Sequence, residues 1–230
     1  LDKTTLINLV KSEISGFELG DRTLYVNLFK PVITPNFIVT QLMARIPLEA
    51  DEEDVYSFGK SDVRILSTNK DIKHLYHLTP PEFKLTEDQY ELLNLARGVL
   101  AEHKPREEEF LEPEKMRHTM FNIGRDLLQE LAESRNISLS FKELEDLTNV
   151  LVRYTVGFGL LEVLLQDKKV QDITLNGPIG QTPIFIVHED YDDCVTNIIP
   201  SQEDADSWAS KFRILSGRPL DEANPVLDTE

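Results

Sequence analysis

Residues 153–177, RYTVGFGLLEVLLQDKKVQDITLNG, contain the clearest structural signals in this chain. Gly157 and Gly159 interrupt a helical pattern and predict a tight turn between two helices, because glycine enters turn conformations without steric penalty. Residues 160–165 are predicted as a short helix and residues 173–176 as a strand. Asn176 and Gly177 then favour a turn with positive φ. Helix and strand alternate closely here, which indicates a mixed α and β structure.

Capped helices precede this stretch. Thr86 with Gln89, and Ser140 with Glu143, have the capping-box spacing, in which each side chain bonds the other residue's backbone N–H. Helical periodicity predicts another helix between these two. We therefore expect a small helical bundle across residues 85–155. The predicted apolar stripes of the three helices are Leu92, Leu93, Ala96, Val99 and Leu100; Met116, Met120, Ile123, Leu127, Leu128 and Leu131; and Leu144, Leu147, Leu151 and Tyr154.

Further toward the N-terminus, alternating polar and apolar residues predict a β-hairpin over 62–78 with its turn at 68–71. The acidic run at 49–54 is predicted to be a solvated surface loop. Residues 6–10 are predicted as a short helix, residues 24–29 as a strand, and 37–43 as an apolar stretch of either type.

Beyond residue 177, strands are predicted at 183–188 and 194–199. Ser201 with Asp204 predicts the start of a last helix, whose buried stripe is expected to include Trp208 and Phe212, and Gly217 has the position of a C-cap glycine. The expected fold class is therefore α+β: a small helical bundle plus a compact few-stranded sheet flanked by helices. We expect two parts: an irregular α/β part over 1–110, and a helical segment with the α+β module over 111–230.

Composition restricts the function. The net charge of −17 argues against nucleic acid as a partner, because phosphate binding requires clustered Lys and Arg. The single cysteine, Cys194, fits a reducing compartment. The five histidines lack metal-ligand spacing, so no metal site is predicted, and His188 is expected at the surface end of a strand. No nucleophile–base set can be assigned, and Gly157-Phe158-Gly159 lacks the spacing of a phosphate-binding loop.

Two segments nevertheless resemble a known family. The first is residues 153–177, in which the turn at Gly157 and Gly159 precedes the motif residues Leu161, Glu162, Leu164, Leu165, Asp167, Val170, Asp172, Ile173, Asn176 and Gly177. The second is SGRPLDEANPVLD at 216–228, which includes Asp221 and Glu222. Both are similar to the N-terminal region of the type II/type IV secretion-system ATPases, the hexameric motors of secretion, pilus and archaellum assembly. Residues 185–188 resemble the archaeal branch of that family.

This resemblance implies that a RecA-like domain with ATP and magnesium follows Glu230 in a longer parent protein, and that this segment holds no cofactor of its own. The implied partners are that domain, neighbouring subunits of a hexamer and an inner-membrane platform or assembly protein. The implied location is cytoplasmic, peripheral to the membrane through these partners. No catalytic residue is expected here, and the segment alone should not hydrolyse ATP.

Three arginines are the candidate nucleotide-cleft or ring-interface residues: Arg218, Arg213 and Arg153. A guanidinium can present a planar fork to phosphate or to a carboxylate. The alternative for Arg218 is a local pair with Asp221 or Glu222. The alternative for the whole segment is a stand-alone partner- or ligand-binding α+β module without motor activity.

Overall fold

The computed structural model describes residues 40–43, 46–47, 49–68, 72–102, 113–221 and 223–228. These residues belong to one compact unit, Thr34–Glu230. The chain's other unit, Leu1–Ile33, lies outside the described residues. The helix expected at 6–10 and the strand expected at 24–29 therefore lie outside them as well.

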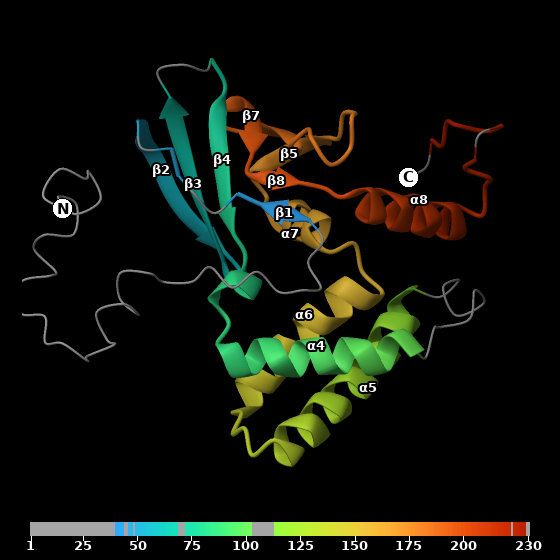
Figure 1. The fold of residues 1–230 in the computed structure, drawn as a ribbon. Helices are drawn as coiled ribbons and strands as arrows, with labels where there is room; N and C mark the ends of the chain where they lie inside the picture. The colour runs from blue at the N-terminus through green and yellow to red at the C-terminus, as the bar shows by residue number, and fades with distance from the viewer. Residues whose placement is uncertain are drawn as a thin grey trace, which may run out of the picture. The chain divides into compact units, whose positions relative to one another are not determined.

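In the described ranges, six strands form one mixed sheet (Figure 1). Its strands, in sheet order, are β2 (Ala50–Phe58), β3 (Ser61–Thr68), β4 (His74–Thr79), β7 (Asp192–Thr196), β6 (Phe185–His188) and β5 (Val170–Thr174). All neighbours pair antiparallel except β4 and β7, which are parallel, with Leu75 opposite Val195. The α+β fold class is confirmed. Strands β2, β3 and β4 belong to the part predicted over 1–110, and strands β5, β6 and β7 belong to the part predicted over 111–230. Both predicted parts therefore contribute to one sheet.

The hairpin predicted over 62–78 is confirmed as β3 and β4, although its turn at 69–71 is not described. The prediction of a surface loop at 49–54 is wrong from Ala50 onward, because residues 50–54 form the first half of edge strand β2, and Glu49 alone lies in a turn. Their backbone pairs with β3, with Asp51 opposite Ser67, while the acidic side chains reach solvent. An edge strand tolerates such charges, and they discourage pairing with other chains.

The stretch predicted as one strand at 194–199 is divided at Asn197. The second piece, β8 (Ile198–Ile199), pairs instead with β1 (Gln41–Leu42). The buried Asn197 side chain accepts from the Leu78 N–H at 2.9 Å and donates to the carbonyls of Leu78 (3.0 Å) and Met43 (3.2 Å). A side-chain amide thus replaces ladder bonds and turns the strand.

Helices α4 (Glu87–Glu102), α5 (Pro113–Ser134) and α6 (Phe141–Thr155) pack on one another as the predicted bundle (Figure 1). A short 3₁₀ helix, η1 (Pro81–Lys84), precedes them. The capping boxes of Thr86 with Gln89 and of Ser140 with Glu143 are confirmed. Their shared core includes Leu92, Leu93, Met116, Met120, Leu128, Leu144, Leu147 and Leu151. Val99 and Ile123, predicted in the buried stripes, are exposed instead.

Helix α7 (Leu160–Gln166) packs on the sheet, and helix α8 (Gln202–Ser216) follows β8. The second core combines Val63, Ile65, Tyr76, Leu78, Leu160, Leu161, Val163, Leu164, Ile184, Ile186, Cys194, Ile198 and Trp208. The Ser201–Asp204 capping box and the C-cap Gly217, at φ 64°, are confirmed. Phe212, expected in the buried stripe of α8, is only partly covered, with 38% of its surface exposed.

The expectation for Asn176 and Gly177 is wrong. Neither has a positive φ; the Gly177–Pro178 peptide is cis and the positive φ occurs at Gly180. The strand there is β5, which begins at Val170 and ends at Thr174, so Asn176 follows it. No single helix in the described ranges is both long and apolar enough to cross a membrane; α6 and α7 meet that test only together, with a bend of 112°.

Candidate functional site

The turn between α6 and α7 is built around the absence of a side chain at Gly157. A Cβ atom there would lie 2.7 Å from the carbonyl oxygen of Arg153 and would collide with the Glu162 carboxylate. Gly159 is the N-cap of α7 and has φ 59°, a conformation that favours glycine. The prediction of a tight turn between two helices is confirmed, and its cause is a close approach of backbone and carboxylate.

Glu162 connects this turn to the helical bundle. Its carboxylate accepts the Phe158 backbone N–H at 2.9 Å. It also accepts two bonds from Arg117 on α5, from Nη1 and Nη2, both at 2.9 Å. The side chain of Glu162 is mostly buried, whereas Arg117 is half exposed. This bidentate geometry is the strongest form of an arginine–carboxylate contact, and it fixes α7 relative to α5.

Helix α8 docks on the same turn. The Trp208 indole N–H donates to the carbonyl of Phe158 at 3.0 Å, and Lys211 Nζ donates to the carbonyl of Gly157. The rings of Phe158 and Phe212 lie 5.1 Å apart between centroids. Trp208 is the buried residue of α8. Contacts to two consecutive turn residues therefore hold much of this helix.

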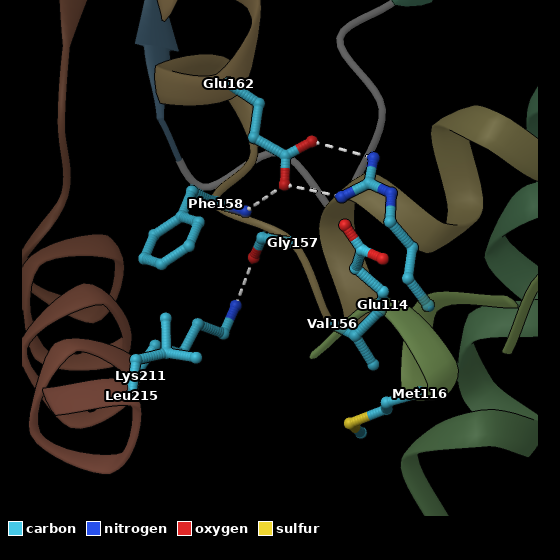
Figure 2. A pocket seen from close by; sticks show the side chains of 9 residues that line it. Glu114, Met116, Val156, Gly157, Phe158, Glu162, Lys211 and Leu215 are labelled. Carbon is cyan, nitrogen blue, oxygen red and sulfur yellow. Dashed lines mark hydrogen bonds and ion pairs between the residues drawn. The ribbon is translucent and has the colours of Figure 1, made fainter. Parts of the chain in front are cut away.

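A pocket of about 150 Å³ opens where α5, the turn and α8 meet (Figure 2). Its apolar wall consists of Met116, Val156, Phe158 and Leu215. Its polar lining consists of Glu114, Arg117, Glu162, Lys211 and the backbone of Gly157. Figure 2 shows the Glu162 carboxylate directed toward the Phe158 N–H and the Lys211 ammonium directed toward the Gly157 carbonyl. Burial lowers the pKa of Lys211.

Arg153 is one of the three arginines considered for a nucleotide cleft. It forms an ion pair with Glu82 in which both side chains are buried. Burial raises the pKa of the Glu82 carboxyl, while the charge of Arg153 acts in the opposite direction. A guanidinium committed to such an internal pair stabilises the contact of η1 with α6. Breaking the pair to reach an external phosphate would leave a buried charge unpaired.

Arg213 and Arg218 lie apart from this pair. Arg213 is exposed in the last turn of α8, and Arg218 is exposed just after it. Arg218 Nη1 donates to the carbonyl of Asp228 at 3.0 Å. Of the two expected local partners, Asp221 or Glu222, the second lies outside the described residues. Neither arginine lines the pocket of Figure 2. Both remain accessible for a contact with another protein surface.

The remaining motif residues have structural positions. Asp221 Oδ1 accepts the backbone N–H groups of Ala223 (3.0 Å) and Asn224 (2.8 Å), which forms a local turn. The hydrogen bond from the Asn224 side chain is the largest cause of the lowered Asp221 pKa, and these backbone bonds add to it. Glu222 lies outside the described residues. Asp172 is exposed on β5 and accepts the Ile173 N–H at 2.8 Å.

A buried polar network lies at the other end of α7. Asp167 Oδ2 accepts the hydroxyls of Tyr56 (2.6 Å) and Tyr76 (2.7 Å). His188 Nε2 lies 3.1 Å from the Tyr56 hydroxyl oxygen, and His188 Nδ1 accepts the Asp190 N–H at 3.1 Å. Because Nδ1 accepts, Nε2 carries the proton and donates to Tyr56, whose own proton goes to Asp167.

The expectation of a surface His188 is therefore wrong, since this side chain is 1% exposed. Burial is the largest cause of its lowered pKa, followed by the charge of Lys169. Burial and Asp167 raise the pKa of Tyr56. Asp167 belongs to the segment that resembles the secretion-system ATPases. Its partners Tyr56 and Tyr76 are distant in the sequence, and no local pattern indicates them.

The sequence interpretation also missed Arg117 and Lys211. A hint existed for Lys211, because it lies three residues after Trp208 and so shares a helix face with a buried indole. Arg117 gave no such signal, because its partner Glu162 is on another helix.

No protein-family model matches the chain. Part of it is similar to two proteins of the archaeon Methanocaldococcus jannaschii. The uncharacterized protein MJ1288 is 27% identical over 105 residues, which cover 45% of this chain and 41% of MJ1288. The uncharacterized protein MJ0781 is 28% identical over 95 residues, which cover 41% of this chain and 13% of MJ0781. The similarity thus spans less than half of either relative.

Proposed function

We propose that this chain is a non-catalytic N-terminal region of a hexameric secretion or pilus-assembly ATPase. In this role it transmits ATP-driven motion of the ring to a membrane platform or assembly protein. ATP and magnesium belong to a RecA-like domain elsewhere in the parent protein. The region acts in the cytoplasm and reaches the membrane only through its partners.

One observation carries this proposal: the two segments that resemble the motor family lie on either side of a single small contact. The first contains the turn Gly157–Gly159 and helix α7, and the second begins at the end of α8. Trp208 and Lys211 join α8 to the carbonyls of that turn. A displacement of residues 217–228 would therefore reach the turn through α8.

The contacts beyond the turn continue this path. Glu162 accepts from the Phe158 N–H and pairs with Arg117, so a displaced turn pulls on α5. Helix α7 itself is fixed on the sheet by Leu160, Leu161, Val163 and Leu164, all buried. Four buried residues hold α7 on the sheet, whereas Trp208 is the one buried residue of α8. Helix α8 can therefore move relative to α7, as an element that transmits motion must.

A stand-alone ligand- or partner-binding module is the alternative function, and the half-open apolar pocket of Figure 2 favours it. The two functions differ in what the parent gene encodes beyond the codon for Glu230. The motor requires a Gly-x-x-x-x-Gly-Lys-Ser/Thr loop after a predicted strand. The module requires none.

The deciding experiment uses the full-length parent protein and this chain side by side. We expect magnesium-dependent ATP hydrolysis from the parent and none from the chain. Amide hydrogen exchange in α5 and α8 of the parent should change between its ADP-bound and ATP-analogue-bound forms. Trp208→Ala should abolish the change in α5 while hydrolysis persists, and Phe141→Ala, at an exposed position, should alter neither. A parent without a phosphate-binding loop, or an α5 that is insensitive to nucleotide, would refute the proposal.

A further inference from the structure

The Lys211 ammonium in the pocket of Figure 2 has more hydrogen-bonding capacity than the protein uses. An ammonium carries three N–H donors. Among the described residues, one hydrogen-bond acceptor is found for them, the carbonyl of Gly157, and the ammonium also lies 5.6 Å from the centroid of the Phe158 ring. The carboxylates that act on Lys211 through space are Glu162 and Asp204, and neither lies within ion-pair distance of it in the described ranges.

Both carboxylates are engaged elsewhere. Glu162 accepts from Arg117 and from the Phe158 N–H. Asp204 accepts from Thr40 Oγ1 at 2.7 Å and from Ser201 in the α8 capping box. Lys211 therefore presents a partly desolvated cation whose charge has no hydrogen-bonded counter-ion among the described residues. Such a group favours an anion that can reach it. The other carboxylate in the pocket lining, Glu114, opposes an anion, but it is exposed and therefore screened by solvent.

The size and the apolar wall of the pocket beside the Lys211 ammonium restrict what the rest of a bound ligand can be. The pocket holds about 150 Å³, and Met116, Val156, Phe158 and Leu215 give it an apolar wall. A cavity of about this size accommodates one benzene-sized group. Arg117 differs from Lys211 because two of its five N–H donors bond the Glu162 carboxylate, which neutralises the guanidinium charge.

We propose that this pocket binds a small monocarboxylate whose body is a single aromatic ring or a branched aliphatic group. The carboxylate accepts from Lys211 Nζ, and the apolar body contacts Phe158, Val156 and Leu215. The inference concerns binding only, and it does not depend on the motor function.

Electrostatics predict how such a ligand is selected. A carboxylate forms a charge-assisted bond with the ammonium, whereas the neutral amide of the same shape offers only an ordinary acceptor. Binding also supplies the missing counter-ion, so it should raise the lowered pKa of Lys211 and weaken at high pH, where the amine loses its proton.

The test compares benzoate with benzamide on the unmodified chain by titration calorimetry, supported by ligand-observed NMR. We expect benzoate to bind about tenfold or more tightly than benzamide, in line with a hydrogen bond to a charged group. Isovalerate should bind and acetate should not, because acetate lacks the apolar body. Equal affinities for benzoate and benzamide, or no detectable benzoate binding, would overturn the proposal.

Variants then locate the site. Lys211→Met keeps the length of the side chain, removes the charge, and should reduce benzoate affinity to that of benzamide. Lys142→Gln also removes one positive charge, at an exposed helical position that does not line the pocket, and should leave benzoate affinity unchanged. Leu215→Gln should weaken benzoate and benzamide alike. Retained benzoate preference in a folded Lys211→Met protein would assign the binding to another place and refute this site.

Discussion

Trp208 donates its indole N–H to the backbone carbonyl of Phe158 across 3.0 Å, and this bond joins α8 to the turn between α6 and α7. The two residues are 50 positions apart in the sequence. The indole belongs to the same core as α7, so a single side chain both packs into the sheet layer and fixes the turn. The behaviour of α8 should therefore depend strongly on Trp208.

The first prediction concerns this bond. Trp208→Phe keeps an aromatic ring but removes the N–H donor and part of the buried surface. We expect the free energy of unfolding to fall by about 1 to 3 kcal/mol, from the lost hydrogen bond and the smaller ring. Urea denaturation measures it. Phe141→Leu, at a side chain 71% exposed, is the control and should change stability by less than about 0.5 kcal/mol. Similar losses for both variants would contradict the assigned role.

The second prediction concerns glycine at the turn. Gly157→Ala forces a methyl group against the Glu162 carboxylate and the Arg153 carbonyl, so we expect a loss of about 1 to 3 kcal/mol in unfolding free energy. Gly98→Ala is a matched control in the exposed face of α4, where a Cβ meets nothing within 4 Å. It should stabilise the protein by up to about 1 kcal/mol, because alanine favours helix. Thermal unfolding of both proteins should therefore shift in opposite directions.

The third prediction concerns the Arg117–Glu162 pair. A double-mutant cycle with Arg117→Met and Glu162→Gln should give a coupling energy of about 1 to 3 kcal/mol, because the pair is bidentate and Glu162 is largely buried. The exposed pair Arg135–Glu91 provides the comparison and should give about 0.5 kcal/mol or less. If the two cycles gave the same coupling, burial and bidentate geometry would not be what strengthens the first pair.

The fourth prediction concerns pH. The pKa of His188 is lowered in the folded protein, whereas an unfolded histidine titrates near about 6.5. As the pH falls through that value, the unfolded state takes up the proton first, so stability falls. Protonation of Nδ1 would also remove the acceptor of the Asp190 N–H.

The groups that surround this imidazole set its response. Burial and Lys169 oppose its protonation, while Asp167, Asp190 and Asp54 favour it. We expect unfolding free energy to decrease between about pH 7.5 and about pH 5.5, and His188→Gln to flatten this dependence. The exposed His118→Gln should leave the slope unchanged. A slope that survives in His188→Gln would assign the pH sensitivity to other groups.

Local chemistry made several elements predictable. The capping boxes at Ser140 and Ser201 and the C-cap at Gly217 involve residues no more than four positions apart, so their bonds follow from the chain itself. The turn at Gly157 was predicted for the same reason. The acidic run failed as a prediction because charge indicates exposure, and an edge strand is exposed along its outer face.

The helices, their caps, the hairpin and the mixed α and β class could be predicted from the sequence, because helical periodicity and turn chemistry act within a few residues. The pairing of β4 with β7 is seen only in the folded protein. The same holds for the hydrogen bonds from Tyr56 and Tyr76 to Asp167, and for the contacts of Arg117 and Lys211 around the turn between α6 and α7. The paired residues lie between 45 positions apart, for Arg117 and Glu162, and 120 positions apart, for Leu75 and Val195. Such contacts depend on how whole layers pack, and no short pattern in the chain encodes that.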